Sequence, residues 1–280
     1  SDLLRISANQ LTELPEWLLQ LPRLTWLAFA GNPFAHTLEA RALANAPTLH
    51  IAWQHLQLQH PLGEGASGVI HQAVWRTDEG AQTVAVKLFK GTVTSDGLPD
   101  CEMAACMHAG AHPHLVSAIG RVTAHPQQVQ ALVMPLIAPE FGNLAGPPSL
   151  ESCTRDVYPV SLRIPASVLL HLARCMADAV AHLHQNGVMH GDLYAHNILY
   201  NAEGHGLLGD FGAASFLPVN DVDSAQTLQR IEVRAFGILL GELLGLCSES
   251  AGDAEPAKRS KLKALQQRCT QADMSRSEER

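Results

Sequence analysis

Three polar side chains between His190 and Gly212 have types and a spacing that suit phosphate chemistry. Asp192 and Asn197 stand five residues apart in the string HGDLYAHNIL, and Asp210 follows in the string LGDFG. Two short apolar runs separate these strings, with the turn-rich segment NAEGHG between them. Carboxylate and amide side chains supply the oxygen atoms that surround phosphates and their cations. The stretch therefore predicts a phosphate site.

A glycine-rich turn lies earlier in the chain, between two predicted strands. Residues 56–62 alternate apolar and polar side chains, the string GEGASGVI follows, and residues 69–75 form the next strand. This strand, turn and strand differ from the strand-to-helix setting of a dinucleotide-binding fold. Gly63, Gly65 and Gly68 would let backbone N–H groups approach phosphates closely.

The next predicted strand, TVAVKLF, ends its apolar alternation at Lys87. Two interpretations are open at this point. A lysine at the edge of a strand is usually solvated, whereas a buried lysine needs a carboxylate partner. Glu102, which opens a predicted helix over residues 102–108, is the candidate partner.

These strings occur in the order found in the protein kinases, which the chain resembles from about residue 56 onward. The resemblance also rests on VAVK, HPHLV and the predicted helix EVRAFGILLGELL. It implies that Asp192 accepts the proton of a substrate hydroxyl and that Asn197 and Asp210 hold Mg²⁺. Because Asp210 ends an apolar run, we expect a buried carboxylate that would be costly without a cation.

The resemblance also implies an ATP site. Lys87 would reach the α- and β-phosphates with Glu102 as its partner. Met134 stands at the gatekeeper position, and the hinge offers the Pro135 carbonyl and the Ile137 N–H to the adenine edge. The residues expected to contact ATP are Gly63, Gly65, Gly68, Val69, Ala85, Lys87, Met134, Pro135, Ile137 and Leu199.

The HGDLYAHN loop departs from the kinase pattern at three positions. Gly191 replaces the Arg that in most kinases pairs with a phosphorylated activation segment. Tyr194 replaces the Lys that contacts the transferring phosphate, and His196 stands where tyrosine kinases often carry Arg. Either side chain could compensate. The residues assigned to catalysis are all present, which favours an active enzyme over a degenerate one.

The segment after DFG is short and reaches the next helix within about two dozen residues. No APE string precedes that helix, and Glu232 stands where Asp is usual. Without an Arg at position 191, we expect activity that does not require phosphorylation of this segment. Its candidate acceptors are Ser215, Ser224 and Thr227.

The first forty or so residues carry an internal repeat. Leu4, Ile6, Asn9 and Leu11 recur 23 residues later as Leu27, Phe29, Asn32 and Phe34. The pattern resembles a leucine-rich repeat, in which the apolar positions face inward and the Asn side chain bonds the loop backbone. Such units need stacked neighbours, so we expect further repeats upstream of Ser1 and a closing helix over residues 36–50. The alternative is an amphipathic extension packed on the next domain.

The opposite face of the repeat strands is expected to bind a partner. Leu3, Arg5, Trp26 and Ala28 alternate with the inward positions and would be exposed there. An exposed Trp beside Leu suits a docking surface. The alternative is that the kinase lobe or the closing helix covers Trp26.

Composition argues against several classes of protein. The formal net charge of -8 over 280 residues disfavours a nucleic-acid-binding surface, which needs clustered basic side chains. The six cysteines form no CxxC pair, which favours reduced thiols in a cytoplasmic protein. We expect no membrane contact, because no apolar run approaches a membrane span and no signal peptide opens the chain.

These observations predict an α+β fold, in which a bilobal protein-kinase-like domain follows the last leucine-rich repeats of a solenoid. Residues 1–50 would form the repeat end and its closing helix, residues 51–137 a five-stranded amino-terminal lobe, and residues 138–280 a reduced carboxy-terminal lobe. The expected activity is transfer of the γ-phosphate of MgATP to a protein hydroxyl, most simply of the serine/threonine type, although the motifs do not separate Ser/Thr from Tyr acceptors. Alternatives are a small-molecule phosphotransferase, a nucleotide-binding pseudokinase scaffold, and a repeat protein whose kinase half only displays the repeats.

Overall fold

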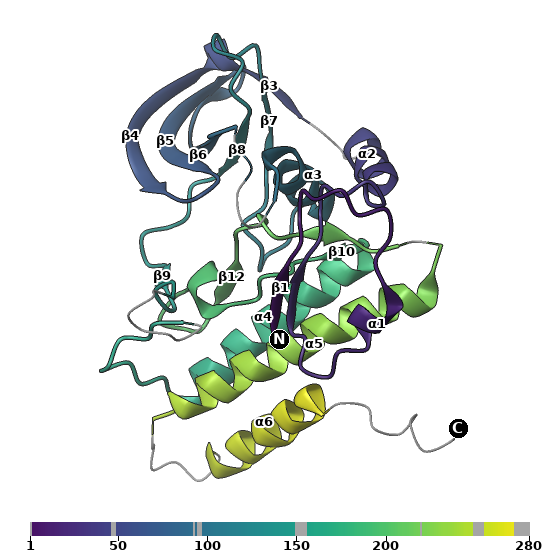
Figure 1. Cartoon of the computed structure of the whole chain (residues 1–280). Helices are drawn as coiled ribbons and strands as arrows, with labels where there is room; N and C mark the ends of the chain where they lie inside the picture. The colour runs from purple at the N-terminus through teal and green to yellow at the C-terminus, as the bar shows by residue number, and fades with distance from the viewer. Residues whose placement is uncertain are drawn as a thin grey trace.

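The computed structural model describes residues 2–45, 49–91, 93, 97–148, 156–218, 220–248 and 255–271. These residues form an upper lobe built on a β-sheet and a lower lobe that is mainly helical (Figure 1). The predicted α+β class and the two lobes are therefore confirmed. No solenoid of stacked repeats is present among the described residues.

The upper lobe is a six-stranded sheet in the order β3-β7-β8-β6-β5-β4, in which only the β3–β7 pair is parallel. Its elements are β3 (His50–Ala52), the one-turn helix η1 (Trp53–His55), β4 (Leu56–Glu64), β5 (Gly68–Thr77), β6 (Gly80–Phe89), β7 (Gly120–Thr123) and β8 (Ala131–Pro135). The sequence predicts five of the strands. With three residues, β3 is too short to give a periodic signal.

The alternation of side chains along β6 directs Lys87 toward the space between the lobes. Successive side chains of a strand point to opposite faces of the sheet. Val84 and Val86 accordingly join a small outer core, whereas Ala85 belongs to the large core that reaches into both lobes. Lys87 lies on the same face as Ala85.

The helix α3 (Pro99–Ala109) packs beside the sheet and carries Glu102 in its first turn. Proline at the first helical position suits a helix start, and Gly110, with a φ of 69°, ends it. The helix α2 (His36–Asn45) lies against α3 (Figure 1). Because it is covered on more than one side, α3 is almost entirely buried.

The lower lobe is built on α4 (Ala166–Gln185), α5 (Val222–Gly245) and α6 (Glu255–Thr270), which pack on one another (Figure 1). The sequence does not predict α6. By length and composition, α4 could cross a membrane, which corrects the expectation that no apolar run approaches that size. Its buried Leu169, Leu172, Met176 and Leu183 follow helical spacing and lie in the large core, the pattern of a core helix.

Short strand pairs bring two loops together between the lobes. The pairs are β10 (Val188–Met189) with β13 (Ser215–Phe216), and β11 (Ile198–Tyr200) with both β12 (Gly206–Leu208) and β9 (Gly142–Asn143). The loop between β10 and β11, residues 190–197, carries HGDLYAHN and the one-turn helix η2 (Ala195–Asn197); we call it the catalytic loop. The DFG string lies between β12 and β13, so the two loops are neighbours.

Residues 2–35 form a compact N-terminal unit of β1 (Leu3–Arg5), α1 (Glu16–Leu19) and β2 (Trp26–Ala28). The two strands are parallel, with Leu3 opposite Trp26 and Arg5 opposite Ala28. This register equals the 23-residue shift of the sequence repeat.

Asn32 closes this unit as the repeat pattern predicts. Its Nδ2 donates to the carbonyls of Ile6 and Phe29, both at 2.8 Å, and its Oδ1 accepts from the backbone N–H of Leu11 at 3.2 Å. The described residues thus contain one such strand pair and not a stack of repeats.

The lower lobe covers the β2 part of the strand face that the sequence suggests is exposed, whereas Leu3 of β1 is exposed as expected. Trp26 and Ala28 are only 3% and 1% exposed. The Trp26 ring stacks on Tyr194 of the catalytic loop, with centroids 4.5 Å apart and planes 10° apart. Its Nε1 donates to the Leu193 carbonyl at 3.3 Å. The expectation of an exposed docking face at Trp26 is therefore wrong, and the alternative, cover by the kinase lobe, is correct.

The opposite face of the N-terminal unit is covered as well. Leu27 of β2 shares a core with Met189 of β10 and with Leu228 and Ile231 of α5. The unit is thus part of the lower lobe's hydrophobic core.

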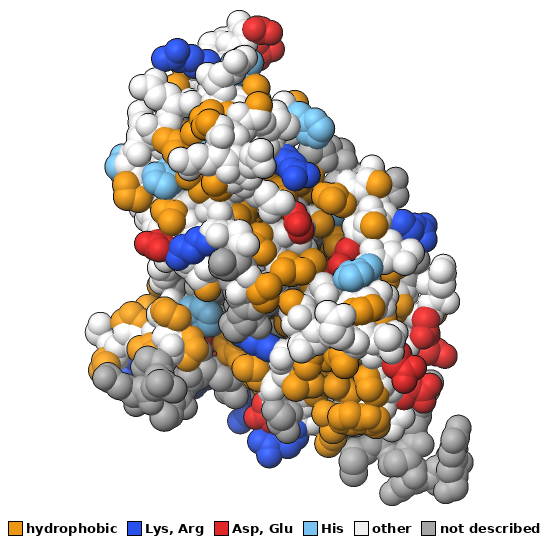
Figure 2. Space-filling view, turned by 45° about the horizontal axis from the view of Figure 1, so that its top comes forward, with side chains coloured by type: hydrophobic (Ala, Val, Ile, Leu, Met, Phe, Trp, Pro, Cys, Tyr) orange, Lys and Arg blue, Asp and Glu red, His pale blue; other side chains and the backbone are white. Residues whose placement is uncertain are grey.

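Basic side chains are scattered on the face shown in Figure 2, where Lys and Arg stand singly or in small groups among neutral and apolar side chains. Outside the grey atoms, that face carries no broad basic patch of the kind that nucleic acids require.

We predict that Trp26→Ala destabilises the protein by about 3–5 kcal/mol, because it removes a buried aromatic side chain and leaves a cavity. Trp17→Ala is the matched control, since Trp17 lies in the same unit but is 63% exposed; its effect should stay within about 0.5 kcal/mol. Urea unfolding monitored by far-UV circular dichroism measures both. Equal midpoints for the two variants would contradict the buried junction.

Candidate active site

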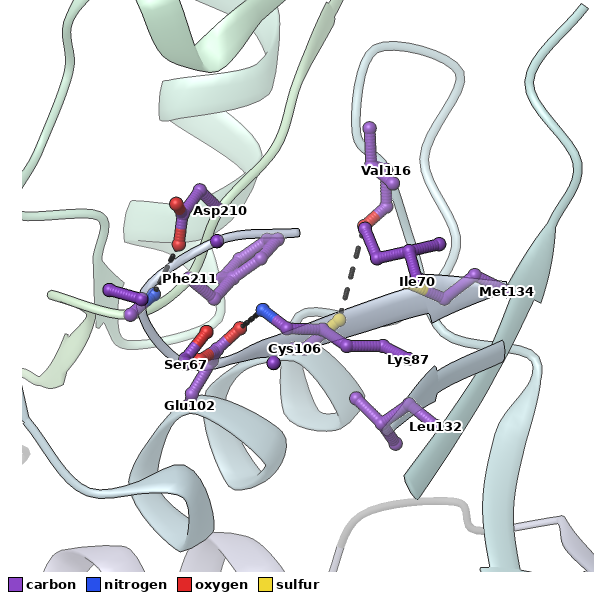
Figure 3. Close-up of a pocket in the computed structure, with 14 residues that line it drawn as sticks. Ser67, Ile70, Lys87, Glu102, Cys106, Val116, Leu132, Met134, Asp210 and Phe211 are labelled. Carbon is purple, nitrogen blue, oxygen red and sulfur yellow. Dashed lines mark hydrogen bonds and ion pairs between the residues drawn. The ribbon is translucent and has the colours of Figure 1, made fainter. Parts of the chain in front are cut away.

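Lys87 and Glu102 form an ion pair in the pocket between the lobes (Figure 3). The side chains are 12% and 6% exposed. Burial raises the pKa of Glu102, and the adjacent Lys87 ammonium offsets this only in part. The structure therefore brings together the lysine and the carboxylate that the sequence pairs.

The pocket lies beneath the glycine loop and contains part of the predicted ATP site. Its lining is Gly65, Ala66, Ser67, Gly68, Ile70, Lys87, Glu102, Cys106, Val116, Leu132, Met134, Asp210, Phe211 and Gly212 (Figure 3). Predicted contacts that do not line it are Gly63, Val69, Ala85, Pro135, Ile137 and Leu199. The apolar lining from Ile70, Cys106, Val116 and Leu132 is not predicted, because strand alternation does not reveal which face meets a ligand.

The glycines of this loop serve different purposes. A Cβ on Gly68 would lie 2.5 Å from the Leu88 carbonyl oxygen, so the close pairing of β5 and β6 requires glycine there. A Cβ on Gly63 or Gly65 would meet nothing within 4 Å. The space beside these two is open to a ligand.

Asp210 holds an unusual backbone conformation beside the pocket. Its φ is 57°, which non-glycine residues adopt rarely, and its Oδ1 accepts from the Gly212 N–H at 3.1 Å. The residue is exposed, so the expectation of a buried carboxylate is wrong. The cost of burying a charge therefore gives no reason to place a metal ion at Asp210, and the position of the residue beside the pocket is the remaining reason.

Asp192 and Asn197 are joined within the catalytic loop. Asn197 Nδ2 donates to the carbonyl oxygen and to Oδ2 of Asp192, both at 2.9 Å. The other carboxylate oxygen, Oδ1, forms an ion pair with Arg5 Nη2 at 3.0 Å. Arg5 lies 187 positions away in the sequence, and no sequence signal predicts this contact.

Asn197 and Asp210 offer the kind of oxygen atoms that Mg²⁺ takes as ligands beside phosphates and water. Because Asn197 directs Nδ2 to Asp192, its Oδ1 is the amide atom that remains for a cation. Across the described ranges, no group of three or more His, Cys, Asp or Glu side chains could hold a metal ion. Mg²⁺ does not need such a cluster, since it is usually bound by one or two protein ligands, phosphates and water.

A buried carboxylate on α5 holds the start of the catalytic loop. Glu232 is 1% exposed and accepts from the N–H groups of His190 at 3.2 Å and Gly191 at 2.8 Å. Its Oε2 lies 2.8 Å from His184 Nε2. Burial by itself would raise the pKa of Glu232, but the hydrogen bond and charge of His184, the charge of His190 and the Gly191 N–H outweigh it, so the pKa is lowered.

Asp156 holds the other end of the loop, and the sequence does not predict it. Its carboxylate accepts from the N–H groups of Ala195 at 3.0 Å and His196 at 2.9 Å, and lies 2.7 Å from His196 Nδ1. The surrounding segment has little pattern, so a single Asp in it carries no signal. His196 is thus turned to Asp156, and Tyr194 stacks on Trp26.

Ser215 does not suit the role of a phosphate acceptor in this conformation. It is 1% exposed, and its Oγ accepts from the Phe29 N–H of the N-terminal unit at 3.2 Å.

The cysteines of the described ranges are free thiols, and Cys153 lies outside those ranges. Burial raises the pKa of both Cys101 and Cys106 to about 12. Cys106, although it lines the pocket, is therefore a poor nucleophile.

The comparisons with known proteins agree with this geometry. Residues 56–234 match the family model described as protein tyrosine and serine/threonine kinase. The chain is 25% identical to fibroblast growth factor receptor 1 of Pleurodeles waltl, over 86% of this chain and 33% of the relative. It is 32% identical to the tyrosine-protein kinase Abl of Drosophila melanogaster, over 58% of this chain and 9% of the relative. It is also 32% identical to the serine/threonine-protein kinase PkaA of Streptomyces coelicolor, over 56% of this chain and 29% of the relative. The matches thus span a third or less of each relative's length.

We predict that Glu232→Gln destabilises the protein by about 3 kcal/mol at neutral pH, because it breaks a buried charged network while keeping its shape. The lowered pKa makes the contribution of Glu232 complete above its ordinary pKa and lost as the pH falls through the lower, folded value. The stability difference between wild type and variant should therefore be constant near pH 7 and shrink in strong acid. Urea midpoints across this pH range measure it; a difference that grows in acid would contradict the assignment.

Proposed function

Because this chain belongs to the protein tyrosine and serine/threonine kinase family, we propose that it transfers the γ-phosphate of MgATP to a protein hydroxyl. Two observations carry this proposal. Lys87 of β6, Glu102 of α3 and Asp210 line one pocket. The Asp192–Asn197 pair lies on the adjoining catalytic loop, where the Asn197 carbonyl accepts from the N–H of Gly209, next to Asp210, at 2.9 Å. Protein kinases use this set of groups for phosphoryl transfer.

Each residue has a role that its position supports. Lys87, fixed by Glu102, would orient the α- and β-phosphates, and the open space beside Gly63 and Gly65 would admit them. Asp210 and Asn197 would hold Mg²⁺, which offsets phosphate charge when it is bound. Asp192 would accept the proton of the attacking hydroxyl, a contribution worth about 10²- to 10⁴-fold in rate.

The predicted adenine contacts belong to the same proposal. The hinge groups of Pro135 and Ile137, together with Val69, Ala85 and Leu199, would contact the base. Serine or threonine is our proposed acceptor, and hydrolysis of the labelled product to its phosphoamino acids decides it. The division at residues 50 and 51 and a cytoplasmic location remain predictions.

The N-terminal unit remains a proposed relative of the leucine-rich repeats. Its 23-residue register and the bonding of Asn32 support the likeness. Docking of a partner on the Trp26 face is not part of the proposal, because the catalytic loop occupies that face.

We predict that the wild-type protein labels casein or lysate proteins with the γ-phosphate of ATP. Asp210→Asn should abolish this transfer, and Asp192→Asn should reduce it by about 10²- to 10⁴-fold. Glu203→Gln is the control, since Glu203 is exposed on the hairpin between the two loops. Melting temperatures check that every variant is folded.

The outcomes separate the alternatives. Undiminished transfer by folded Asp210→Asn would remove the metal assignment. Transfer of the label to a small molecule, with no protein labelled, would favour the small-molecule phosphotransferase. The short segment after DFG supports this alternative. A MgATP-dependent rise in melting temperature without any transfer would favour the nucleotide-binding scaffold.

A further inference from the structure

The catalytic loop carries no Lys or Arg beside Asp192, and His190 Nδ1 accepts from the backbone N–H of Asp192 instead of contacting its carboxylate. Position 191 is Gly, position 194 is Tyr, and His196 places its Nδ1 2.7 Å from Asp156. The cation that contacts Asp192 is Arg5 of the N-terminal unit, whose Nη2 lies 3.0 Å from Oδ1. Arginine stays protonated at any working pH, so this hydrogen bond is always assisted by charge.

The segment after DFG and the N-terminal unit together occupy the space that a side chain at position 191 would need. Gly191 has a φ of 77°, and a Cβ there would lie 2.9 Å from the Leu27 carbonyl oxygen of β2 and 2.5 Å from that of Ala213. A cation carried by residue 191 is therefore incompatible with this arrangement of the catalytic loop, the segment after DFG and the N-terminal unit. The charge beside Asp192 has to come from another segment.

Arg5 is held in place by two sets of contacts. Its strand pairs with β2, with Arg5 opposite Ala28. β2 in turn is fixed to the catalytic loop, because Trp26 stacks on Tyr194 and donates to the Leu193 carbonyl. The guanidinium thus approaches Asp192 from a rigid element.

We propose that Arg5 is a positioning residue, which holds the Asp192 carboxylate for phosphoryl transfer in place of a cation on the catalytic loop. Asn197 binds Oδ2 and Arg5 binds Oδ1, so the carboxylate is held from both sides in one orientation. This role rests on the proposed kinase activity. The N-terminal unit then supports the active site permanently and does not act as a removable lid. Its Leu27 carbonyl lies beside Gly191, and its Trp26 stacks on Tyr194.

Three variants test the role of Arg5. Arg5→Gln removes the charge, Arg5→Lys keeps it, and Arg23→Gln is the matched control, because Arg23 pairs with Asp2 on the exposed side of the same unit. The measurements are kcat and KM for ATP with casein as acceptor, and the urea midpoint of each variant. If Arg5→Gln does not fold, Arg5→Met, which keeps the apolar stem, replaces it.

Arg5→Gln should lower kcat by about 10- to 100-fold, the size of effect expected when a catalytic group is misplaced. KM for ATP should change by less than about twofold, because Arg5 is not among the residues that line the pocket between the lobes. Arg5→Lys should recover part of kcat, and Arg23→Gln should match wild type.

Three results would overturn the role of Arg5. A higher kcat for Arg5→Gln would show that the ion pair inhibits the enzyme. A kcat equal to that of Arg23→Gln would show that it does not position Asp192. If the wild type binds MgATP but labels no protein, the proposed function fails and the role of Arg5 fails with it. If the wild type is active and Arg5→Gln has the same kcat, only the role of Arg5 fails.

Discussion

The buried carboxylate of Glu232 is the constraint on which the geometry of the lower lobe depends. An uncompensated charge in such a place would cost several kcal/mol. Here His184 and the N–H groups of His190 and Gly191 compensate it. These N–H groups open the catalytic loop, so the loop cannot shift along α5 without exposing the charge to an apolar core. Asp156 holds the far end of the loop in the same way, and the positions of the intervening side chains follow.

The N-terminal unit adds an attachment at the middle of that loop. Its β2 contacts Leu193 and Tyr194 through Trp26 on one side, and on the other side Leu27 packs with Ile231 of α5. Glu232 follows Ile231 on α5. This helix therefore supports the catalytic loop directly through Glu232, and indirectly through Ile231 and the N-terminal unit. Stability of the unit and geometry of the loop are therefore linked, which is why a junction residue such as Trp26 cannot also serve as a free docking residue.

The sequence predicts the parts of the site that depend on local pattern. Alternation along β6 places Lys87, and motif order places Glu102, Asp192, Asn197 and Asp210. It does not predict contacts between distant segments, such as Arg5 with Asp192 or Asp156 with His196. The two-residue alternation of a strand shows which side chains share a face. It does not show whether another element covers that face. For this reason the pattern gives the β1–β2 register correctly and the exposure of Trp26 wrongly.

Residues 2–45 also reach α3, the helix that carries Glu102. The backbone N–H of Gly31 donates to Glu39 Oε1 at 2.7 Å, which ties the N-terminal unit to α2. α2 packs on α3, the helix that carries Glu102. A single continuous segment thus reaches Asp192 through Arg5 and the helix of Glu102 through α2. The position of Asp192 and the position of the helix that carries Glu102 are therefore linked through this one segment, although the two carboxylates lie on different elements.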